Sequence, residues 1–314
     1  MTPFRISHAL VINRIHLHTP RTKGKMPNRP RVNYIAPATQ AMNKGAVYST
    51  KHVENIIPSL DGIVEKVTYF KSRHQNLDAW YINPKNSQKM VMFVHGNGKN
   101  ITNYQELYAQ LLNDGFGIFA VEYRGHGFNP AAKVNEHNMS ADVERAYKYL
   151  ISKKGVAPEN LVVLAHSMGG VLASNLVAKH PEIKSIVLVS PLNILELCKG
   201  FLTNPKVGLG FPERAYIISK SFKPLQWVQG LSFNTSRNLR HNQVPLTIIH
   251  SEHDNVTGIQ GSKIIAAQAE VRGLLKGAYW LPKGGHELNA GKFGAVSDAL
   301  RNVFGLPKRV DVTV

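Results

Sequence analysis

The chain has 314 residues, of which 43% are hydrophobic and 18% are charged, so it can bury a sizeable core in one or two domains. No apolar stretch reaches the roughly 18 residues of a membrane-spanning helix, and a single cysteine, Cys198, excludes an intramolecular disulfide. The formal net charge of +18 favours contact with anionic surfaces over cationic ones.

Residues 1–58 are predicted to form a basic, irregular arm outside the folded core. Nine Lys and Arg residues and no acidic residue occur between Met1 and Val53. Such an arm attracts anionic lipid or nucleic acid, or is only a solvated leader, and it is also similar in composition to an organelle transit peptide. We expect a cytoplasmic location, with association with an anionic membrane or organelle targeting as alternatives. Nucleic acid is the less favoured partner.

The region from 59 to 306 alternates short apolar strands with amphipathic helices. Strands are expected over residues 63–71, 77–82, 90–95, 116–121, 161–165, 185–189, 245–250 and 278–281. Helices are expected from a Thr102–Gln105 capping box to Gly115, over Val143–Ile151, over Gly169–Ala178 and over Phe293–Phe304. This alternation predicts an α/β fold with a mostly parallel, doubly wound sheet and helices on both faces. Residues 193–242 interrupt it and predict a short cap insertion that is helical in part, and residues 307–314 form a short C-terminal tail.

A serine follows the strand at 161–165 without a loop, in the stretch "LAHSMGG". A serine on such a sharp strand-to-helix turn projects its hydroxyl above the sheet edge, and the turn requires small neighbours. Ala165 and Gly169 are small, although the pattern G-x-S-x-G has a glycine where Ala165 stands. Ser167 is therefore a candidate nucleophile, and the alternative is that it only starts the helix as an N-cap.

A nucleophilic serine needs a histidine base and a carboxylate that orients the base. Because these groups gather at the carboxyl ends of parallel strands, we examine the loops after the later strands. The loop after residues 245–250 offers Glu252 and Asp254, and the loop after 278–281 offers His286. We predict Asp254 as the acid, because it lies further along the loop than Glu252, and His286 as the base in preference to an ordinary surface histidine.

The loop "HGNGKN" after the strand at 90–95 predicts one half of an oxyanion hole, because its glycines allow close backbone approach. The predicted donors are the backbone N–H groups of Asn97 and of Met168, the residue after the nucleophile. A plain tight turn is the alternative for this loop.

The stretches "FVHGNGKN", "VEYRGHG", "LAHSMGG", "HSEHDNV" and "PKGGHEL" occur in one order between about residues 60 and 306. Together they resemble the α/β-hydrolases, in the branch that includes monoglyceride lipases and serine-aminopeptidase-like proteins. The resemblance implies the α/β-hydrolase fold, the triad Ser167–Asp254–His286 and an oxyanion hole at Asn97 and Met168. It places the insertion at 193–242 where the family has its lid.

The sequence therefore predicts a serine hydrolase that cleaves carboxylic esters of lipid-like or medium-sized acyl groups, with no cofactor and no metal. The same triad serves thioesterases, acyltransferases and serine peptidases, and these remain alternatives. An alternative of another class is a catalytically silent, hydrolase-like protein that binds an anionic membrane or nucleic acid through its basic arm.

Overall fold

The computed structural model describes residues 56–72, 76–127, 129, 134–193 and 233–308. Most of the arm (residues 1–55), most of the insertion, Cys198 and the end of the predicted tail lie outside these residues. Eight strands form one sheet: β1 (Glu65–Lys71), β2 (Asn76–Ile82), β3 (Met90–Val94), β4 (Gly117–Val121), β5 (Leu161–His166), β6 (Ser185–Val189), β7 (Leu246–Ser251) and β8 (Leu275–Leu281). The α-helices are α2 (Gln105–Asn113), α3 (Glu136–Lys154), α4 (Met168–Val177), α8 (Thr235–Asn238), α9 (Ile259–Val271) and α10 (Ala290–Val303). Short 3-10 turns are η1 (Pro58–Leu60), η2 (Ile101–Tyr104), η3 (Pro158–Asn160) and η4 (Leu239–His241).

The strand order in the sheet is β1-β2-β4-β3-β5-β6-β7-β8. β1 and β2 are antiparallel to each other, β2 is antiparallel to β4, and the strands from β4 to β8 run parallel. The central strands β3 to β7 are buried along their whole length, because helices cover both faces of the sheet. Their sequences are accordingly continuous apolar runs, which is why the sequence predicts them well.

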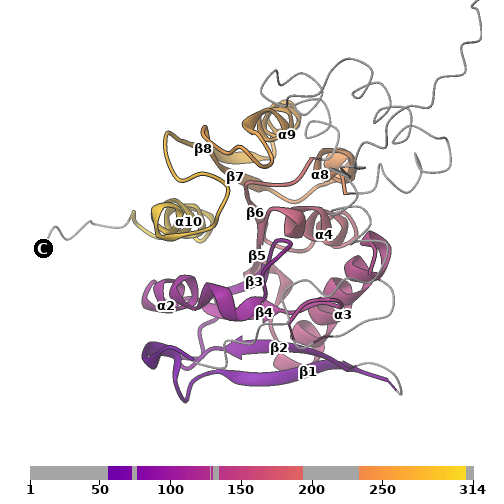
Figure 1. Ribbon diagram of the computed structural model, residues 1–314, viewed down its shortest axis with the longest axis vertical. Helices are drawn as coiled ribbons and strands as arrows, with labels where there is room; N and C mark the ends of the chain where they lie inside the picture. The colour runs from indigo at the N-terminus through magenta and orange to yellow at the C-terminus, as the bar shows by residue number, and fades with distance from the viewer. Residues whose placement is uncertain (1–55, 73–75, 128, 130–133, 194–232, 309–314) are drawn as a thin grey trace, which may run out of the picture.

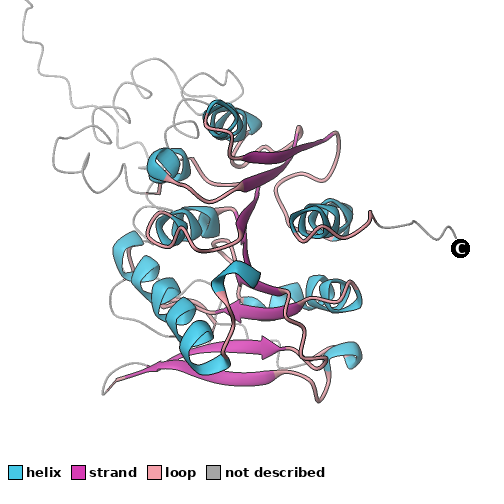
Figure 2. Cartoon of the chain, turned by 180° about the vertical axis from the view of Figure 1, so that it is seen from behind, coloured by secondary structure: helices cyan, strands magenta, loops and turns pink. Residues whose placement is uncertain are grey.

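Two helical layers enclose the sheet. Figure 1 shows α2 and α10 on one side of the sheet and α3, α4, α8 and α9 on the other, and Figure 2 shows the same two layers from behind. Each layer has its own buried apolar cluster, one centred on the α3 and α4 side and one on the α2 and α10 side. The predicted doubly wound sheet with helices on both faces is thus confirmed.

Two local predictions were wrong. The helix near residue 102 begins with a capping box of Asn100 and Asn103, not of Thr102 and Gln105. The Asn100 side chain accepts hydrogen bonds from both the N–H and the hydroxyl of Thr102, so Thr102 serves as a donor. The sequence analysis also omitted α9, whose buried side consists largely of small residues and therefore gives a weak apolar stripe.

The two described ends of the insertion meet at one place. Asn193 forms a β-bridge with Asn234, and the Thr235 hydroxyl donates to the Leu192 carbonyl at 2.6 Å. Gly261 of α9 lies directly under this bridge, since a Cβ there would be 2.9 Å from the Asn193 Cβ. The insertion therefore leaves and rejoins the folded core at one fixed place after β6. Residues 235–241 are helical, in α8 and η4.

Candidate functional site

Ser167 stands on the turn between β5 and α4 in a strained backbone conformation. Its φ of 53° and ψ of −120° lie in a region that residues with side chains rarely adopt, at a cost of about 1–3 kcal/mol. The N–H of Ser167 donates to the Val189 carbonyl at 3.0 Å, and the Ser167 carbonyl accepts from Leu192 N–H at 3.1 Å. Backbone bonds from β6 and the residues after it thus hold the strained turn.

Glycine is required at the second position after the serine. A Cβ at Gly169 would lie 2.1 Å from the Val94 carbonyl oxygen and 2.5 Å from that of His95. The start of α4 therefore packs directly on the backbone at the end of β3, as the elbow geometry demands. This contact brings the serine next to the loop that follows β3.

Ser167, His286 and Asp254 lie in one hydrogen-bonded line. The Ser167 Oγ is 3.0 Å from His286 Nε2, and His286 Nδ1 is 2.9 Å from Asp254 Oδ2. Because the Nδ1 atom faces a carboxylate, it carries the proton, and Nε2 is left to accept from the serine hydroxyl. This is the geometry of a general base poised on a nucleophile.

Asp254 occupies a buried pocket rich in donors. Its Oδ1 accepts from the N–H groups of Val256 and Thr257, and its Oδ2 accepts from the Thr257 hydroxyl at 3.0 Å. The Nε2 atom of His250 lies 3.1 Å from the same Oδ2. Burial alone would raise the pKa of Asp254, but the nearby His250 and the hydrogen bonds from His286 and Thr257 outweigh it and hold that pKa well below its usual value. The carboxylate therefore stays ionised beside His286.

The other acid on this loop, Glu252, points elsewhere. Its side chain is exposed, and its backbone N–H pairs with the Leu281 carbonyl at 2.8 Å. The structure thus brings Asp254, the predicted acid, against His286 and leaves Glu252 at the surface.

The loop after β3 lies against the elbow. A Cβ at Gly96 would be 3.1 Å from the Ser167 Cβ and 3.0 Å from His166 Nδ1, so this loop approaches the serine as closely as a glycine permits. Asn97 follows Gly96, and Met168 begins α4, where N–H groups have no partner within the helix. The two predicted oxyanion donors thus belong to the two backbone segments that flank Ser167.

A buried pair anchors the loop that follows β3. His95 Nε2 lies 2.7 Å from Glu122 Oε1, and both side chains are fully buried. Glu122 Oε2 also accepts from the Ile101 N–H at 3.1 Å, and the Tyr123 hydroxyl donates to the His95 carbonyl at 2.7 Å. Both ends of the loop from His95 to Ile101 are therefore tied to the two residues that follow β4.

Sequence reasoning overlooked several polar residues that support the site. His250, His166 and Lys292 are all buried and all contact the triad residues or their backbone. The sequence does contain an indication of the buried position of Lys292. Its spacing from Val296 and Ala299 places it on the apolar side of α10. His166 directly precedes Ser167 but lies within an apolar strand pattern that gives no hint of its contact.

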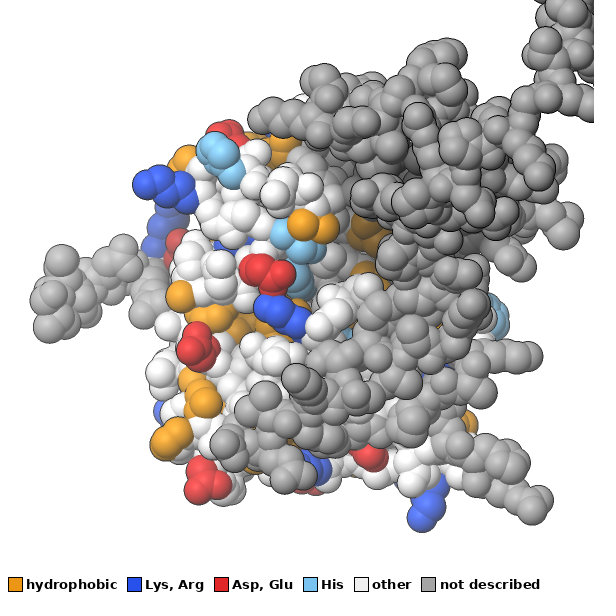
Figure 3. Space-filling view, in the orientation of Figure 1, with side chains coloured by type: hydrophobic (Ala, Val, Ile, Leu, Met, Phe, Trp, Pro, Cys, Tyr) orange, Lys and Arg blue, Asp and Glu red, His pale blue; other side chains and the backbone are white. Residues whose placement is uncertain are grey.

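Figure 3 shows histidine side chains on the face that it draws, with an acidic and a basic side chain next to them. An ion pair between Lys99 of the loop after β3 and Glu287 after His286 joins these two loops.

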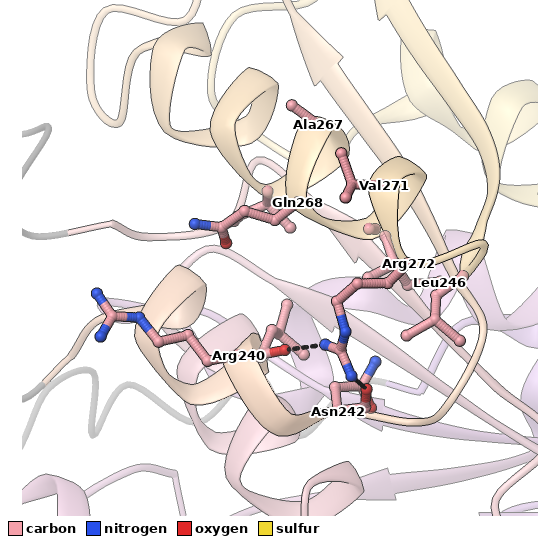
Figure 4. A pocket seen from close by; sticks show the side chains of 11 residues that line it. Arg240, Asn242, Leu246, Ala267, Gln268, Val271 and Arg272 are labelled. Atoms are coloured by element: carbon pink, nitrogen blue, oxygen red, sulfur yellow. Dashed lines mark hydrogen bonds between the residues drawn. The ribbon is translucent and has the colours of Figure 1, made fainter.

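A cavity of about 440 Å³ lies elsewhere, between η4, the start of β7 and the end of α9. Figure 4 shows Arg272 reaching across it to the backbone of Leu239 and Asn242, while Arg240 points away. None of the triad residues lines this cavity, because it lies at the amino end of β7 and the triad lies at the carboxyl ends of the strands. Within the described part of the chain, no group of three His, Cys, Asp or Glu residues is placed to hold a metal ion.

Comparison with known proteins agrees with this architecture. The family model described as serine aminopeptidase, S33, matches residues 85–206. An α/β hydrolase from Vibrio vulnificus superposes with a TM-score of 0.62 at 22% identity, covering 83% of this chain and 89% of that one. The Pyrococcus furiosus esterase Pf2001 superposes with a TM-score of 0.60 at 17% identity, covering 82% and 95%. The chain has the α/β-hydrolase fold.

Curated relatives of this chain include one protein named a lipase and one named for an α/β-hydrolase domain. The lysophosphatidylserine lipase ABHD12 of Macaca fascicularis is 25% identical over 252 residues, which cover 75% of this chain and 59% of that protein. The human α/β hydrolase domain-containing protein 17B is 32% identical over 108 residues, which cover 34% of this chain and 37% of that protein. The chain thus spans about three fifths or less of the length of these two relatives.

Proposed function

We propose that this hydrolase cleaves carboxylic esters of lipid-like or medium-sized acyl groups through a covalent acyl-enzyme. The observation that carries the proposal is the 3.0 Å contact between Ser167 Oγ and His286 Nε2, with Asp254 aligned behind the imidazole. A serine without such a base is a weak nucleophile at neutral pH.

The proposed reaction has two halves. Ser167 Oγ attacks the ester carbonyl while His286 takes its proton, and the Asn97 and Met168 N–H groups stabilise the oxyanion by about 3 kcal/mol per donor. His286 then gives its proton to the departing alcohol. A water molecule, deprotonated by the same imidazole, attacks the acyl-enzyme and releases the acid. Asp254 keeps the imidazole in the required tautomer and offsets its positive charge.

The lipid-like substrate class rests on two observations. One curated relative is named a lysophosphatidylserine lipase, and one structural neighbour is named an esterase. The insertion at 193–242 holds seven Lys and Arg residues and two acidic residues, which favours an anionic substrate or one presented at an anionic membrane. A substrate panel that compares anionic with neutral esters at low salt tests this point, and equal rates for both would contradict it.

Labelling by a fluorophosphonate probe is the first test. We expect wild type to be labelled and Ser167→Ala not to be, because only an activated serine attacks the phosphorus. Ser174→Ala is the matched control, since the buried Ser174 hydroxyl bonds to its own helix at Val171 and is expected to leave labelling intact. A folded wild type that resists the probe would favour the alternative in which Ser167 only starts α4.

Product analysis separates ester hydrolysis from its chemical neighbours. Release of a free acid from an oxygen ester identifies an esterase, whereas preference for a thioester, transfer to an added alcohol, or cleavage of an amide identifies the thioesterase, acyltransferase or peptidase alternative. The family model named for an aminopeptidase makes an aminoacyl amide a necessary member of the panel.

A further inference from the structure

Lys292, on the first turn of α10, is completely buried. Lysine is rarely buried, because the loss of hydration around an ammonium group costs several kcal/mol in the folded protein. Its Nζ atom donates to the Ser190 hydroxyl at 3.0 Å, to the Gly285 carbonyl at 2.7 Å and to the His286 carbonyl at 3.1 Å. All three donors of the ammonium therefore have acceptors, and no carboxylate is among them.

Two of these acceptors belong to the backbone of the proposed base. The Gly285 carbonyl is part of the peptide group before the His286 Cα, and the His286 carbonyl is part of the peptide group after it. One ammonium thus fixes both peptide planes that set the direction of the imidazole. Gly284 and Gly285 have φ values of 117° and 58°, so the backbone leading to His286 has the freedom of glycine and needs such an anchor.

The third acceptor connects the anchor to the nucleophile. Ser190 follows β6, where the preceding residue, Val189, accepts the Ser167 N–H. Ser190 has a φ of 46°, and its N–H donates to the Ile249 carbonyl at 2.9 Å. Lys292 therefore joins the His286 loop to the same sheet edge that carries Ser167.

A second donor holds the His286 carbonyl from the other side. His166 Nε2 lies 3.0 Å from this carbonyl, and His166 Nδ1 lies 3.4 Å from the Tyr104 hydroxyl. Burial, with a smaller effect of the charge on His286, lowers the pKa of His166 to about 3, so its imidazole is neutral and its Nε2 carries the hydrogen. Lys292 supplies the charged donor at this carbonyl and His166 the neutral one.

We propose that Lys292 is a positioning residue whose ammonium group clamps the two peptide groups around His286 and so holds its imidazole between Ser167 and Asp254. The effect on rate rests on the proposed hydrolase function, whereas the effect on the loop does not. Loss of the clamp leaves substrate binding unchanged but reduces the time during which His286 Nε2 faces Ser167. We therefore expect kcat to fall while KM stays nearly constant.

The surroundings of Lys292 give the clamp a characteristic pH dependence. Burial is the largest effect and lowers the pKa of Lys292 to about 8. Asp254 on the loop after β7 and Glu287 next to His286 act in the opposite direction, because their charges favour the ammonium. His286 and His166 are the other titratable groups that face this cluster. A neutral amine has two hydrogens for three acceptors, so the clamp weakens above pH 8.

The stability of the folded protein changes with pH in the opposite direction to the activity. The unfolded chain holds the Lys292 proton more tightly than the folded chain does, so between pH 8 and about 10.4 this residue makes folding more favourable as pH rises. Alkaline loss of activity caused by Lys292 therefore comes without a loss of stability from the same residue. Ordinary alkaline unfolding would lower both together.

The test compares wild type with Lys292→Met, which keeps the straight stem and removes the donors. Amide hydrogen exchange over residues 283–289 is expected to become about tenfold faster or more, while the amides of β3 keep their protection. Fluorophosphonate labelling and kcat are expected to fall about 10- to 100-fold with KM changed less than about twofold, and the alkaline ionisation near pH 8 is expected to vanish. Lys263→Met, an exposed lysine on α9, is the matched control and is expected to behave as wild type.

Two further variants keep the proposal falsifiable. Lys292→Arg retains the charge and is expected to recover part of the loop protection. Ser190→Ala replaces Lys292→Met as the test if Lys292→Met does not fold. It removes one acceptor of the ammonium and leaves the other two, so a smaller rise in exchange at 283–289 and a smaller fall in kcat are expected. Unchanged exchange at 283–289, or faster exchange spread evenly over the chain, would overturn the positioning role. If the probe does not label folded wild type, the proposed function is wrong. Amide hydrogen exchange at residues 283–289 still tests the positioning role of Lys292 in that case.

Discussion

Asp254 shows how one residue can be assigned a role by its donors. Four hydrogen bonds reach its two carboxylate oxygens. A second histidine, His250, places its Nε2 atom 3.1 Å from Oδ2, while its Nδ1 atom lies 2.6 Å from the Ser262 hydroxyl. Such a set orients the carboxylate as well as keeping it ionised, because each oxygen is fixed from more than one direction. Asp254 can therefore hold His286 in a single tautomer throughout the proposed cycle.

Replacement of Asp254 tests this role directly. Asp254→Asn keeps the shape but lets the side chain present an amide to His286 Nδ1, which favours the wrong tautomer. We expect kcat for ester hydrolysis to fall about 10³- to 10⁴-fold. Glu252→Gln, on the same loop but exposed, is expected to stay within about twofold of wild type. A larger loss in Glu252→Gln than in Asp254→Asn would assign the acid to Glu252.

At the scale of elements, the junction of β3, β5 and α4 fixes the site. Gly169 has no room for a Cβ because the atoms that it would meet are the carbonyl oxygens of Val94 and His95, which cannot rotate away. The fold therefore positions Ser167 by backbone-to-backbone packing rather than by side chains, and this makes the position of the hydroxyl insensitive to rotamer changes nearby.

Gly169→Ala is expected to lower the free energy of unfolding by about 3 kcal/mol, because α4 must move away from β3. Gly294→Ala, on the exposed side of α10 with no atom within 4 Å of the new Cβ, is the matched control. It is expected to raise the free energy of unfolding by about 0.5–1 kcal/mol through helix propensity. Urea unfolding of both variants measures the difference, and equal values would show that α4 adjusts without strain.

The sequence predicts elements best where one local pattern decides the outcome. Strands β3 to β7 are short, mostly apolar runs, so their presence and a mostly parallel sheet follow from the alternation with helices. The order β4-β3-β5 in the sheet was not predicted. The Ser167 elbow and the loop with Asp254 directly follow such buried strands, whereas the loop with His286 follows the less buried β8. The helix α9 has no comparable stripe, because Gly261, Ser262 and Ala266 form much of its buried side.

Long-range contacts explain what the sequence does not reveal. Lys292 contacts Ser190, which is 102 residues away, and His166 contacts the backbone of His286, which is 120 residues away. No local pattern encodes these bonds, which form only when β5, β6 and α10 are packed together. The wrong capping residue near Thr102 has a local cause. Asn100 and Thr102 are both good capping residues, and which of them caps the helix depends on the path of the chain after β3.

For the whole molecule, the uneven charge is the dominant feature. The two segments at 1–53 and 193–242 contain 16 of the 38 Lys and Arg residues and two of the 20 acidic residues, so most of the net charge of +18 lies in them. The remainder of the chain is nearly balanced. Within the described residues, no helix is long and apolar enough to cross a bilayer. Because these two segments hold most of the net charge, electrostatic attraction to an anionic lipid surface would come mainly from them.

Vesicle binding tests this picture. We expect the full chain to sediment with vesicles containing about 30% anionic lipid, with each nearby Lys or Arg contributing about 1 kcal/mol, and not with neutral vesicles. The affinity should fall steeply as salt rises, because the interaction is screened beyond about 10 Å at 0.1 M. A variant with Arg5, Arg14, Arg21, Arg29 and Arg31 changed to glutamine is expected to bind much more weakly, yet to retain the labelling of Ser167 by the probe. Salt-independent binding to the vesicles would exclude an electrostatic attachment. The candidate site and the arm are separate parts of the chain, so a loss of both vesicle binding and Ser167 labelling in this variant would show instead that the arm contributes to the site.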